Sequence, residues 1–148
     1  RGQGEAIAKS MFEMAKLKVP IIAIVIGEGS SGGALAIGVA NKVYMLENAI
    51  YSILSPEGYS SILWKDSSRF KEAAEKMKLT AKDLYDLKVI DEIIQEPIEL
   101  KENDFKKITD NIKKEIEKEI KEMSEMTKED IVENRYQKFR NISSFNVI

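Results

Sequence analysis

Hydrophobic residues at the start of the chain lie three or four positions apart, the spacing of a helix with one buried face: Ile7, Met11, Met14 and Leu17. Pro20 cannot continue a helix and disfavours helical backbone at the residue before it, so this helix should end near Lys18. Residues 21–26 form a short β-branched run, which predicts a strand buried on both faces. A glycine-rich segment, Gly27–Gly33, then leads into a small-residue helix predicted over Ala34–Val39.

The middle of the chain alternates short apolar runs with signals for helix starts. Two runs, Val43–Leu46 and Ile50–Leu54, predict further strands. Ser55 is followed by a proline and an acidic residue, a combination that caps and opens a helix. The expected elements from there on are this helix through Trp64, a helix from an Asp66 cap to Met77, a short helix through Leu87 opened by a Thr80–Asp83 capping box, and a strand over Val89–Ile94.

Beyond Pro97 the chain becomes a charged helical tail. In residues 101–122, 14 of 22 positions are charged, seven of each sign, and this balance indicates a solvated face rather than a nucleic-acid site. A final helix should start at Thr127–Asp130. We therefore divide the chain into an α/β body, 1–98, and a helical tail for docking or oligomerisation, 99–148. One apolar stripe, with a period of about 3.6 residues, should dock the first tail helix: Phe105, Ile108, Ile112, Ile116, Ile120 and Met123.

Length and composition fit a globular domain that can bury a core. The chain has 148 residues, of which 43% are hydrophobic and 32% charged, and its net charge of −2 gives no general attraction to nucleic acid or membranes. It has no cysteine and no histidine, which excludes disulfides, thiolate nucleophiles, imidazole-based triads and nearly every transition-metal site. Any chemistry must use backbone donors, hydroxyls, carboxylates or lysines, and we expect no metal.

The first residue and the longest apolar run indicate whether the chain is complete and where the protein is located. The chain begins at Arg1, inside a helical pattern, so we expect a fragment of a longer protein. The longest apolar run, Val19–Ile26, is much shorter than the roughly 20 residues that cross a bilayer. No signal directs the chain out of the cell, and we expect a cytoplasmic protein.

The glycine segment GEGSSGG, Gly27–Gly33, fits several short motifs. A phosphate loop is excluded, because Gly33 and Ala34 occupy the positions of its lysine and hydroxyl residue. A nucleophile elbow would place Ser31 between strand and helix, but the chain lacks the usual histidine base. The glycines could also serve only a tight turn and close packing of helix on sheet.

A dinucleotide-binding module is the stronger alternative. Residues 27–32 fit GxGxxG between a strand and a helix, and Glu47 ends the next strand. Against it, the helix after the loop has barely two turns, and consecutive short strands follow where another βα unit is required. We keep a Rossmann-type module as an alternative.

The positions of Gly32 and Gly33 suggest a third chemistry. At a helix start their N–H groups have no intrahelical partner, and an anionic oxygen would be stabilised there. Because neither residue has a Cβ, a bulky ligand could approach the backbone closely. This is the arrangement of an oxyanion hole made of backbone amides.

Several segments together resemble the C-terminal half of the alpha-subunit family of bacterial-type acetyl-CoA carboxylase carboxyltransferase: RGQGEAIA, the run KVPII to SPEG, SSILWKD, LKVIDEIIQEP and NRYQKF. The resemblance implies the crotonase fold, a spiral of ββα units, with its earlier turns supplied by an N-terminal half. The chain departs from the family at Ser30, which usually is glycine, and at Tyr59 and Ser60, which replace smaller residues.

The resemblance also implies a reaction. Carboxybiotin on a separate carrier protein would give its carboxyl group to acetyl-CoA, forming malonyl-CoA for fatty acid biosynthesis. The ureido oxygen of biotin would rest on the amides of Gly32 and Gly33, with Gly29, Ser30 and Ser31 binding substrate. A beta subunit, which carries zinc where the family has it, would hold the thioester enolate.

The implied partners are that beta subunit, the biotin carboxyl carrier protein and biotin carboxylase, in an ATP-dependent complex with an alpha2beta2 carboxyltransferase. Neither nucleic acid nor a membrane is expected as a partner. Two further alternatives stay open: another crotonase-fold acyl-CoA enzyme, and a non-enzymatic assembly piece.

Other conspicuous residues have simpler interpretations. Met77-Lys78 is similar to the Met-Lys of a biotin carrier, but it ends a helical pattern, so we expect a surface lysine. Glu28 and Glu57 should serve turns or caps. Trp64 should be a core or interface aromatic, and Arg135 with Tyr136 should dock the tail helix.

Overall fold

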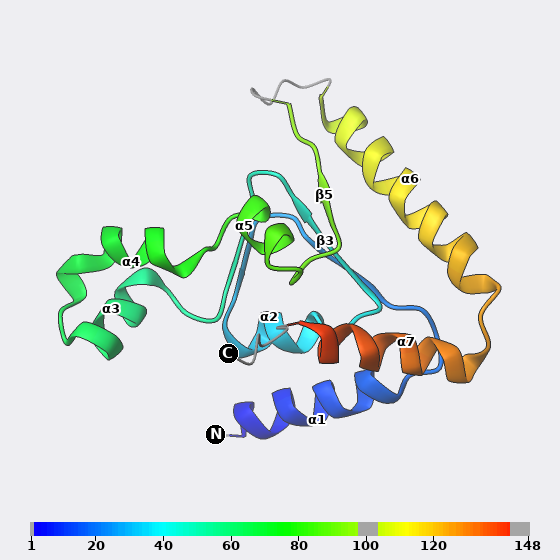
Figure 1. Ribbon diagram of the computed structural model, residues 1–148, viewed down its shortest axis with the longest axis horizontal. Coiled ribbons are helices and arrows are strands. Elements are labelled where there is room, and N and C mark those ends of the chain that lie inside the picture. The colour runs from blue at the N-terminus through cyan, green and yellow to red at the C-terminus, as the bar shows by residue number, and fades with distance from the viewer. Residues whose placement is uncertain (1, 98–103, 143–148) are drawn as a thin grey trace, which may run out of the picture.

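A computed structural model describes residues 2–97 and 104–142 of the chain (Figure 1). A three-stranded parallel sheet lies at its centre, with α1 and α7 side by side along one end and α6 along another side. The elements in chain order are α1 (Gln3–Lys16), β1 (Ile22–Val25), β2 (Glu28–Ser30), α2 (Ser31–Ile37), β3 (Lys42–Leu46), β4 (Ile50–Ser52), α3 (Pro56–Trp64), the 3-10 turn η1 (Ser67–Arg69), α4 (Phe70–Met77), α5 (Ala81–Asp86), β5 (Glu92–Ile94), α6 (Asp104–Ser124) and α7 (Lys128–Asn141).

The strands divide between two parallel sheets in a regular way. One sheet has the order β1-β3-β5, and the other pairs β2 with β4. Ile22 lies opposite Lys42 in the first sheet, and Glu28 lies opposite Ile50 in the second. The first two turns of the chain therefore each add one strand to each sheet and then a helix, and β5 extends the first sheet. This is the ββα spiral that the resemblance implies.

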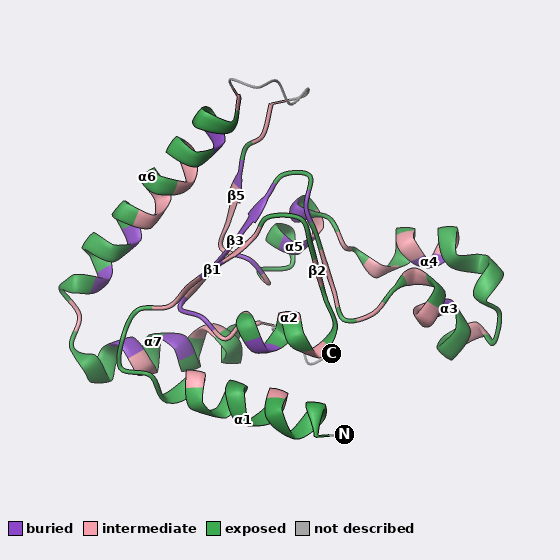
Figure 2. Cartoon of the chain, turned by 180° about the vertical axis from the view of Figure 1, so that it is seen from behind, coloured by how far each residue is buried: buried purple, intermediate pink, exposed green. Residues whose placement is uncertain are grey.

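The core lies around β3, the central strand of its sheet. Tyr44 and Met45 on β3 are almost fully buried, and β5, α5 and α6 contribute Ile94, Leu84 and Ile108 to the same cluster. Figure 2 shows the buried residues concentrated on the central strands and on the inward faces of the helices. The prediction that residues 21–26 are buried on both faces is wrong: only Ala23 is buried, and Ile26 is 71% exposed. The reason is that β1 is an edge strand among the described residues.

The predicted helix caps are present, although several element ends differ. The Ser55 hydroxyl accepts from the Gly58 amide at 3.1 Å, and Asp66 and Thr80 cap η1 and α5 in the same manner. The capping box of Thr127 and Asp130 opens α7. In contrast, α1 ends at Lys16, α2 begins at Ser31 rather than at residue 34, and the last strand covers only Glu92–Ile94.

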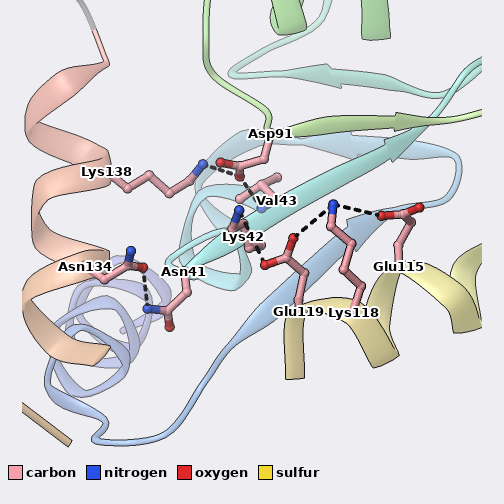
Figure 3. A network of polar contacts seen from close by, with 9 residues as sticks. All are labelled: Asn41, Lys42, Val43, Asp91, Glu115, Lys118, Glu119, Asn134 and Lys138. Carbon is pink, nitrogen blue, oxygen red and sulfur yellow. Dashed lines mark hydrogen bonds and ion pairs between the residues drawn. The ribbon is translucent and has the colours of Figure 1, made fainter. Parts of the chain in front are cut away.

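The apolar stripe of α6 is only partly buried. Ile108 and Met123 are buried, whereas Phe105 and Ile120 are exposed and Glu119 is 2% exposed. Glu119 turns inward because its carboxylate pairs with the Lys42 ammonium of β3, 3.4 Å away (Figure 3). Burial, together with a hydrogen bond to Glu119, raises the pKa of Tyr44, which therefore stays protonated.

Arg135 attaches α7 to the end of α1. Its side chain is almost fully buried, and its guanidinium donates to the carbonyls at the end of α1 and just beyond: Met14, Ala15, Leu17 and Val19, at 2.7–3.2 Å. A further bond of 2.8 Å reaches the buried Asn41 side chain, which also contacts Asn134 of α7 (Figure 3). The predicted docking role is confirmed for Arg135, but Tyr136 is exposed. The predicted boundary between residues 98 and 99 lies outside the described residues.

Helices α3 and α4 form an arm that projects from the sheet (Figure 1). Trp64, the only tryptophan of the chain, lies half-buried in this arm. The ring of Tyr59 meets its edge with a centroid separation of 5.7 Å, and the Arg69 guanidinium lies over it at 4.2 Å. Tyr59 is thus accommodated by a local aromatic contact.

We predict that acid loosens the contacts around Trp64. Hydrogen bonds from Arg69 and then Lys76 lower the pKa of Glu72, and both cations lie over Trp64. The pKa of Glu72 is lower in the folded than in the unfolded protein, so the ionised carboxylate stabilises the fold. This stabilisation is complete at a pH above the unfolded-state pKa of about 4.3 and is lost as the pH falls through the folded-state pKa. Tryptophan emission should be constant above about pH 5 and shift below about pH 4.

Glu72→Gln should remove this acid-dependent shift in emission, because its amide has no charge to lose. Asp110→Asn on α6 is the matched control, and its tryptophan emission should shift with pH as in the parent. A Glu72→Gln variant whose emission still shifts like the parent would contradict the assignment.

Candidate functional site

The glycine segment forms a sharp junction between β2 and α2. Ser30 ends the strand and precedes the helix, and its hydroxyl lies 3.3 Å from that of Ser52 on β4 rather than capping the helix. Ser31 begins α2 with φ +65°, in the left-handed region that favours glycine. The chain thus turns from strand to helix within two residues, and the turn strains a non-glycine backbone.

Gly32 and Gly33 follow as the second and third residues of α2. Their N–H groups belong to the first turn, and within the part of the chain that the structure describes neither has a hydrogen-bond acceptor. A Cβ on Gly33 would meet nothing within 4 Å, and one on Gly32 would meet only Ile7, at 3.4 Å. Packing within the described residues therefore does not require a glycine at position 33, and the space beside Gly33 is open.

Two other glycines have a packing role through Tyr51 of β4. A Cβ on Gly29 would lie 3.0 Å from the Tyr51 ring, and a Cβ on Gly38 would lie 2.6 Å from its hydroxyl oxygen. The hydroxyl donates to the carbonyl of Ala34 in α2 at 3.2 Å, and burial raises the pKa of Tyr51. Sequence reasoning missed Tyr51, because a tyrosine in a strand gives no sign of the glycines that it will meet.

Two hollows flank α2 and share Tyr51. One, of about 380 Å³, runs along β1 and β2 and includes Gly29 and Ser30 in its lining, but not Ser31, Gly32 or Gly33. The other, of about 340 Å³, lies on the side of Leu35 and Met77. The structure therefore separates the five predicted site residues: two line a hollow and three form the exposed junction next to it.

The remaining candidate residues have structural or surface positions. Lys78 is exposed at the end of α4, with its ammonium 3.5 Å from Asp83, and Glu28 and Glu57 are exposed. Glu47 accepts a hydrogen bond from the Glu96 amide at 3.2 Å. The Rossmann alternative is wrong, because the glycine segment passes through β2 in a second sheet before the helix begins.

In the described part of the chain, no three or more histidine, cysteine, aspartate or glutamate side chains are grouped so that they could hold a metal ion. Among the helices of residues 2–97 and 104–142, none combines the length and the apolar character needed to cross a membrane.

Comparison with known proteins identifies relatives along nearly the whole chain. The family model described as acetyl co-enzyme A carboxylase carboxyltransferase-like matches residues 1–143. The carboxyl transferase alpha subunit of Streptococcus uberis is 58% identical over 141 residues, which are 95% of this chain and 54% of that protein. That of Clostridium acetobutylicum is 54% identical over 145 residues, 98% of this chain and 53% of that protein. The chain thus spans about half the length of these alpha subunits.

A relative from Natranaerobius thermophilus joins two subunits in one protein. It is named acetyl-coenzyme A carboxylase carboxyl transferase subunits beta/alpha, and it is 53% identical over 145 residues, 98% of this chain and 24% of that protein.

Solved structures share the fold at low sequence identity. A Pseudomonas malonate decarboxylase hetero-tetramer, crystallised with coenzyme A, aligns with a TM-score of 0.62 and 17% identity over 76% of this chain and 47% of the matched chain. The transcarboxylase 12S structure with methylmalonyl-coenzyme A aligns with a TM-score of 0.54 and 21% identity over 64% of this chain and 21% of that chain.

The ββα spiral and these structural neighbours define a crotonase-like α/β fold. Within that class, the chain belongs to the acetyl co-enzyme A carboxylase carboxyltransferase-like family. The resemblance drawn from the quoted segments is confirmed.

Proposed function

We propose that this chain forms the part of an acetyl-CoA carboxylase carboxyltransferase alpha subunit that stabilises the departing biotin. The substrates are carboxybiotin on a separate carrier protein and acetyl-CoA, and the product is malonyl-CoA. The observation that carries the proposal is the pair of amides at Gly32 and Gly33, which have no acceptor among the described residues, with open space beside Gly33, in a chain of this family. The family name supports the reaction, and the junction supports the role.

In the proposed step, the carbon–nitrogen bond of carboxybiotin breaks and CO2 leaves. The negative charge that develops on the ureido oxygen accepts hydrogen bonds from the Gly32 and Gly33 amides. The ureido nitrogen takes a proton from the methyl group of acetyl-CoA, and the resulting enolate attacks CO2. Removing one donor of this kind in other enzymes costs on the order of 10²- to 10³-fold in kcat. No side-chain base is required, which agrees with a chain that has no histidine.

Gly29, Ser30 and Ser31 shape the approach to these amides. Gly29 and Ser30 line the hollow along β1 and β2, where a substrate could rest. The hydroxyl of Ser31, at the strained position before Gly32, is exposed at the junction. We assign these residues to substrate binding, with the two amides as the catalytic donors.

The thioester site belongs to a beta subunit in this proposal. The fused beta/alpha relative supports a direct partnership of the two subunits. The assembly would be alpha2beta2, with the biotin carboxyl carrier protein and biotin carboxylase completing an ATP-dependent complex for fatty acid biosynthesis in the cytoplasm. Neither nucleic acid nor a membrane takes part.

The 148-residue chain alone should form no malonyl-CoA from acetyl-CoA and carboxybiotin. A full-length alpha subunit that carries this sequence should do so when assembled with its beta subunit. Product formation is measured by mass spectrometry, with alpha alone and beta alone as controls. Malonyl-CoA production by the isolated chain would contradict the shared site, and an assembled complex that acts on another acyl-CoA but not on acetyl-CoA would favour a different crotonase-fold enzyme.

A further inference from the structure

Tyr51 contacts both sides of the β2–α2 junction. It lies directly opposite Gly29 in the β2–β4 ladder, and its ring packs where a side chain on Gly29 would stand, 3.0 Å from that Cβ position. Its hydroxyl crosses to α2 and donates to the Ala34 carbonyl at 3.2 Å. A single side chain therefore connects the strand that enters the junction with the helix that leaves it.

The contact with α2 is close at a second point. Gly38 ends the helix, and a Cβ there would lie 2.6 Å from the Tyr51 hydroxyl oxygen. The Ala34 carbonyl accepts both the Gly38 amide, at 2.9 Å, and the Tyr51 hydroxyl. Because α2 has only seven residues, contacts at Ala34 and Gly38 restrain the whole helix.

We propose that Tyr51 is a positioning residue that sets the direction in which the Gly32 and Gly33 amides point. Ala34 directly follows the glycine pair, so a restraint on its carbonyl acts one residue away from the two donors. The inference rests on the proposed function of these amides. Tyr51 itself contacts no reacting atom; it acts through the helix.

The geometry also explains why this position carries a tyrosine and its neighbours are glycines. Tyr51 is half-buried and lines both hollows beside α2. A larger residue at position 29 or 38 would push the ring or the hydroxyl aside. The hydroxyl stays protonated because burial raises its pKa, and it therefore remains a donor to Ala34.

Tyr51→Phe, which keeps the ring and removes the donor, tests this in the full-length alpha subunit assembled with beta. We expect kcat to fall about 5- to 30-fold, less than the roughly 10²-fold cost of a 1 Å misplacement in an active site. The dissociation constant of acetyl-CoA should stay within about twofold, since that ligand is assigned to beta. Tyr85→Phe on α5, whose side chain is exposed, is the matched control and should leave kcat unchanged.

A double-mutant cycle with Gly33→Pro separates positioning from general destabilisation. If Tyr51 acts through the amides, Tyr51→Phe should lower kcat by a smaller factor in the Gly33→Pro background than in the parent, because one of the two donors that it orients is already gone. An equal loss of kcat in both backgrounds would overturn the inference. A fully active Tyr51→Phe together with an impaired Gly33→Pro would overturn the inference about Tyr51 and leave the proposed function standing. A fully active Gly33→Pro would overturn the proposed function itself.

A steric variant keeps the test usable if Tyr51→Phe fails to assemble. Gly38→Ala places a methyl group against the Tyr51 hydroxyl and should lower kcat by a similar factor. Gly4→Ala on α1, whose added methyl group meets nothing within 4 Å, is the matched control and should leave kcat unchanged. Equal kcat values in Gly38→Ala and Gly4→Ala would contradict the contact between hydroxyl and helix as the cause.

Discussion

Replacing Gly33 by proline in a full-length alpha subunit assembled with beta lowers kcat on the order of 10²- to 10³-fold, the cost of one oxyanion-hole donor. Proline removes the amide hydrogen without breaking an intrahelical bond, because Gly33 lies in the first turn of α2. The φ of Gly33 lies outside the left-handed region, and a Cβ on Gly33 would meet nothing within 4 Å. The loss should appear in malonyl-CoA formation and in the reverse decarboxylation with free biotin.

Gly33→Ala is the matched control for this loss of kcat, since it keeps the N–H and adds a methyl group to open space. Its loss of kcat should be smaller than that of Gly33→Pro, because the methyl group narrows the approach of the ligand but no donor is lost. The dissociation constant of acetyl-CoA, measured by calorimetry, should be nearly unchanged in both variants. A correctly assembled Gly33→Pro with normal turnover, or with weaker acetyl-CoA binding as its only defect, would contradict the role of the amide.

Arg135→Met should lower the free energy of unfolding by about 1.5–3 kcal/mol, the range for losing hydrogen bonds to a charged group. Methionine fills part of the space but removes the donor to four carbonyls at the end of α1 and just beyond, and to the Asn41 side chain. The Met14 carbonyl and the Asn41 Oδ1 keep the amides of Leu17 and Ile21 as donors. Helix α1 should separate from α7, because Arg135 joins them.

Urea unfolding followed by circular dichroism measures this change in stability. Arg140→Met is the matched control, because it makes the same substitution at an exposed position of the same helix. Surface changes of this kind usually stay within about 0.5 kcal/mol. Equal stabilities of the two variants would contradict the central position of Arg135.

Local signals predicted the helix starts of this chain well. Ser55, Asp66, Thr80 and Thr127 all cap helices in the structure, because the chemistry of a cap involves residues only a few positions apart. The start of α2 was placed three residues late. Its first residue, Ser31, has positive φ, and a glycine-rich sequence gives no indication that the serine adopts it.

Burial depends on contacts that are distant in sequence, and here local patterns were less informative. The stripe on α6 predicted Ile120 inside, but its neighbour Glu119 is buried instead, because Lys42 and Tyr44 of β3 offer it partners. The docking role of Arg135 was predicted, but not its acceptors, which lie about 120 residues earlier.

In the candidate site, too, local sequence predicted the helix start but not the contact between distant residues. Gly32 and Gly33 were predicted at a helix start with free amides, and the structure places them there. Gly29 was grouped with them as a substrate residue, yet it also has a packing role against Tyr51, a residue 22 positions further along. The pairing of β2 with β4 creates that contact, and no local motif encodes it.

The most direct test of the account replaces the backbone N–H of Gly33 by an ester oxygen, introduced as glycolic acid at that position in the assembled enzyme. This change removes the donor and adds no side chain and no ring. We predict a loss of kcat on the order of 10²-fold, in carboxyl transfer and in reverse decarboxylation, with acetyl-CoA binding intact. Wild-type turnover in the ester-containing enzyme would show that the Gly33 amide does not stabilise the ureido oxygen of biotin.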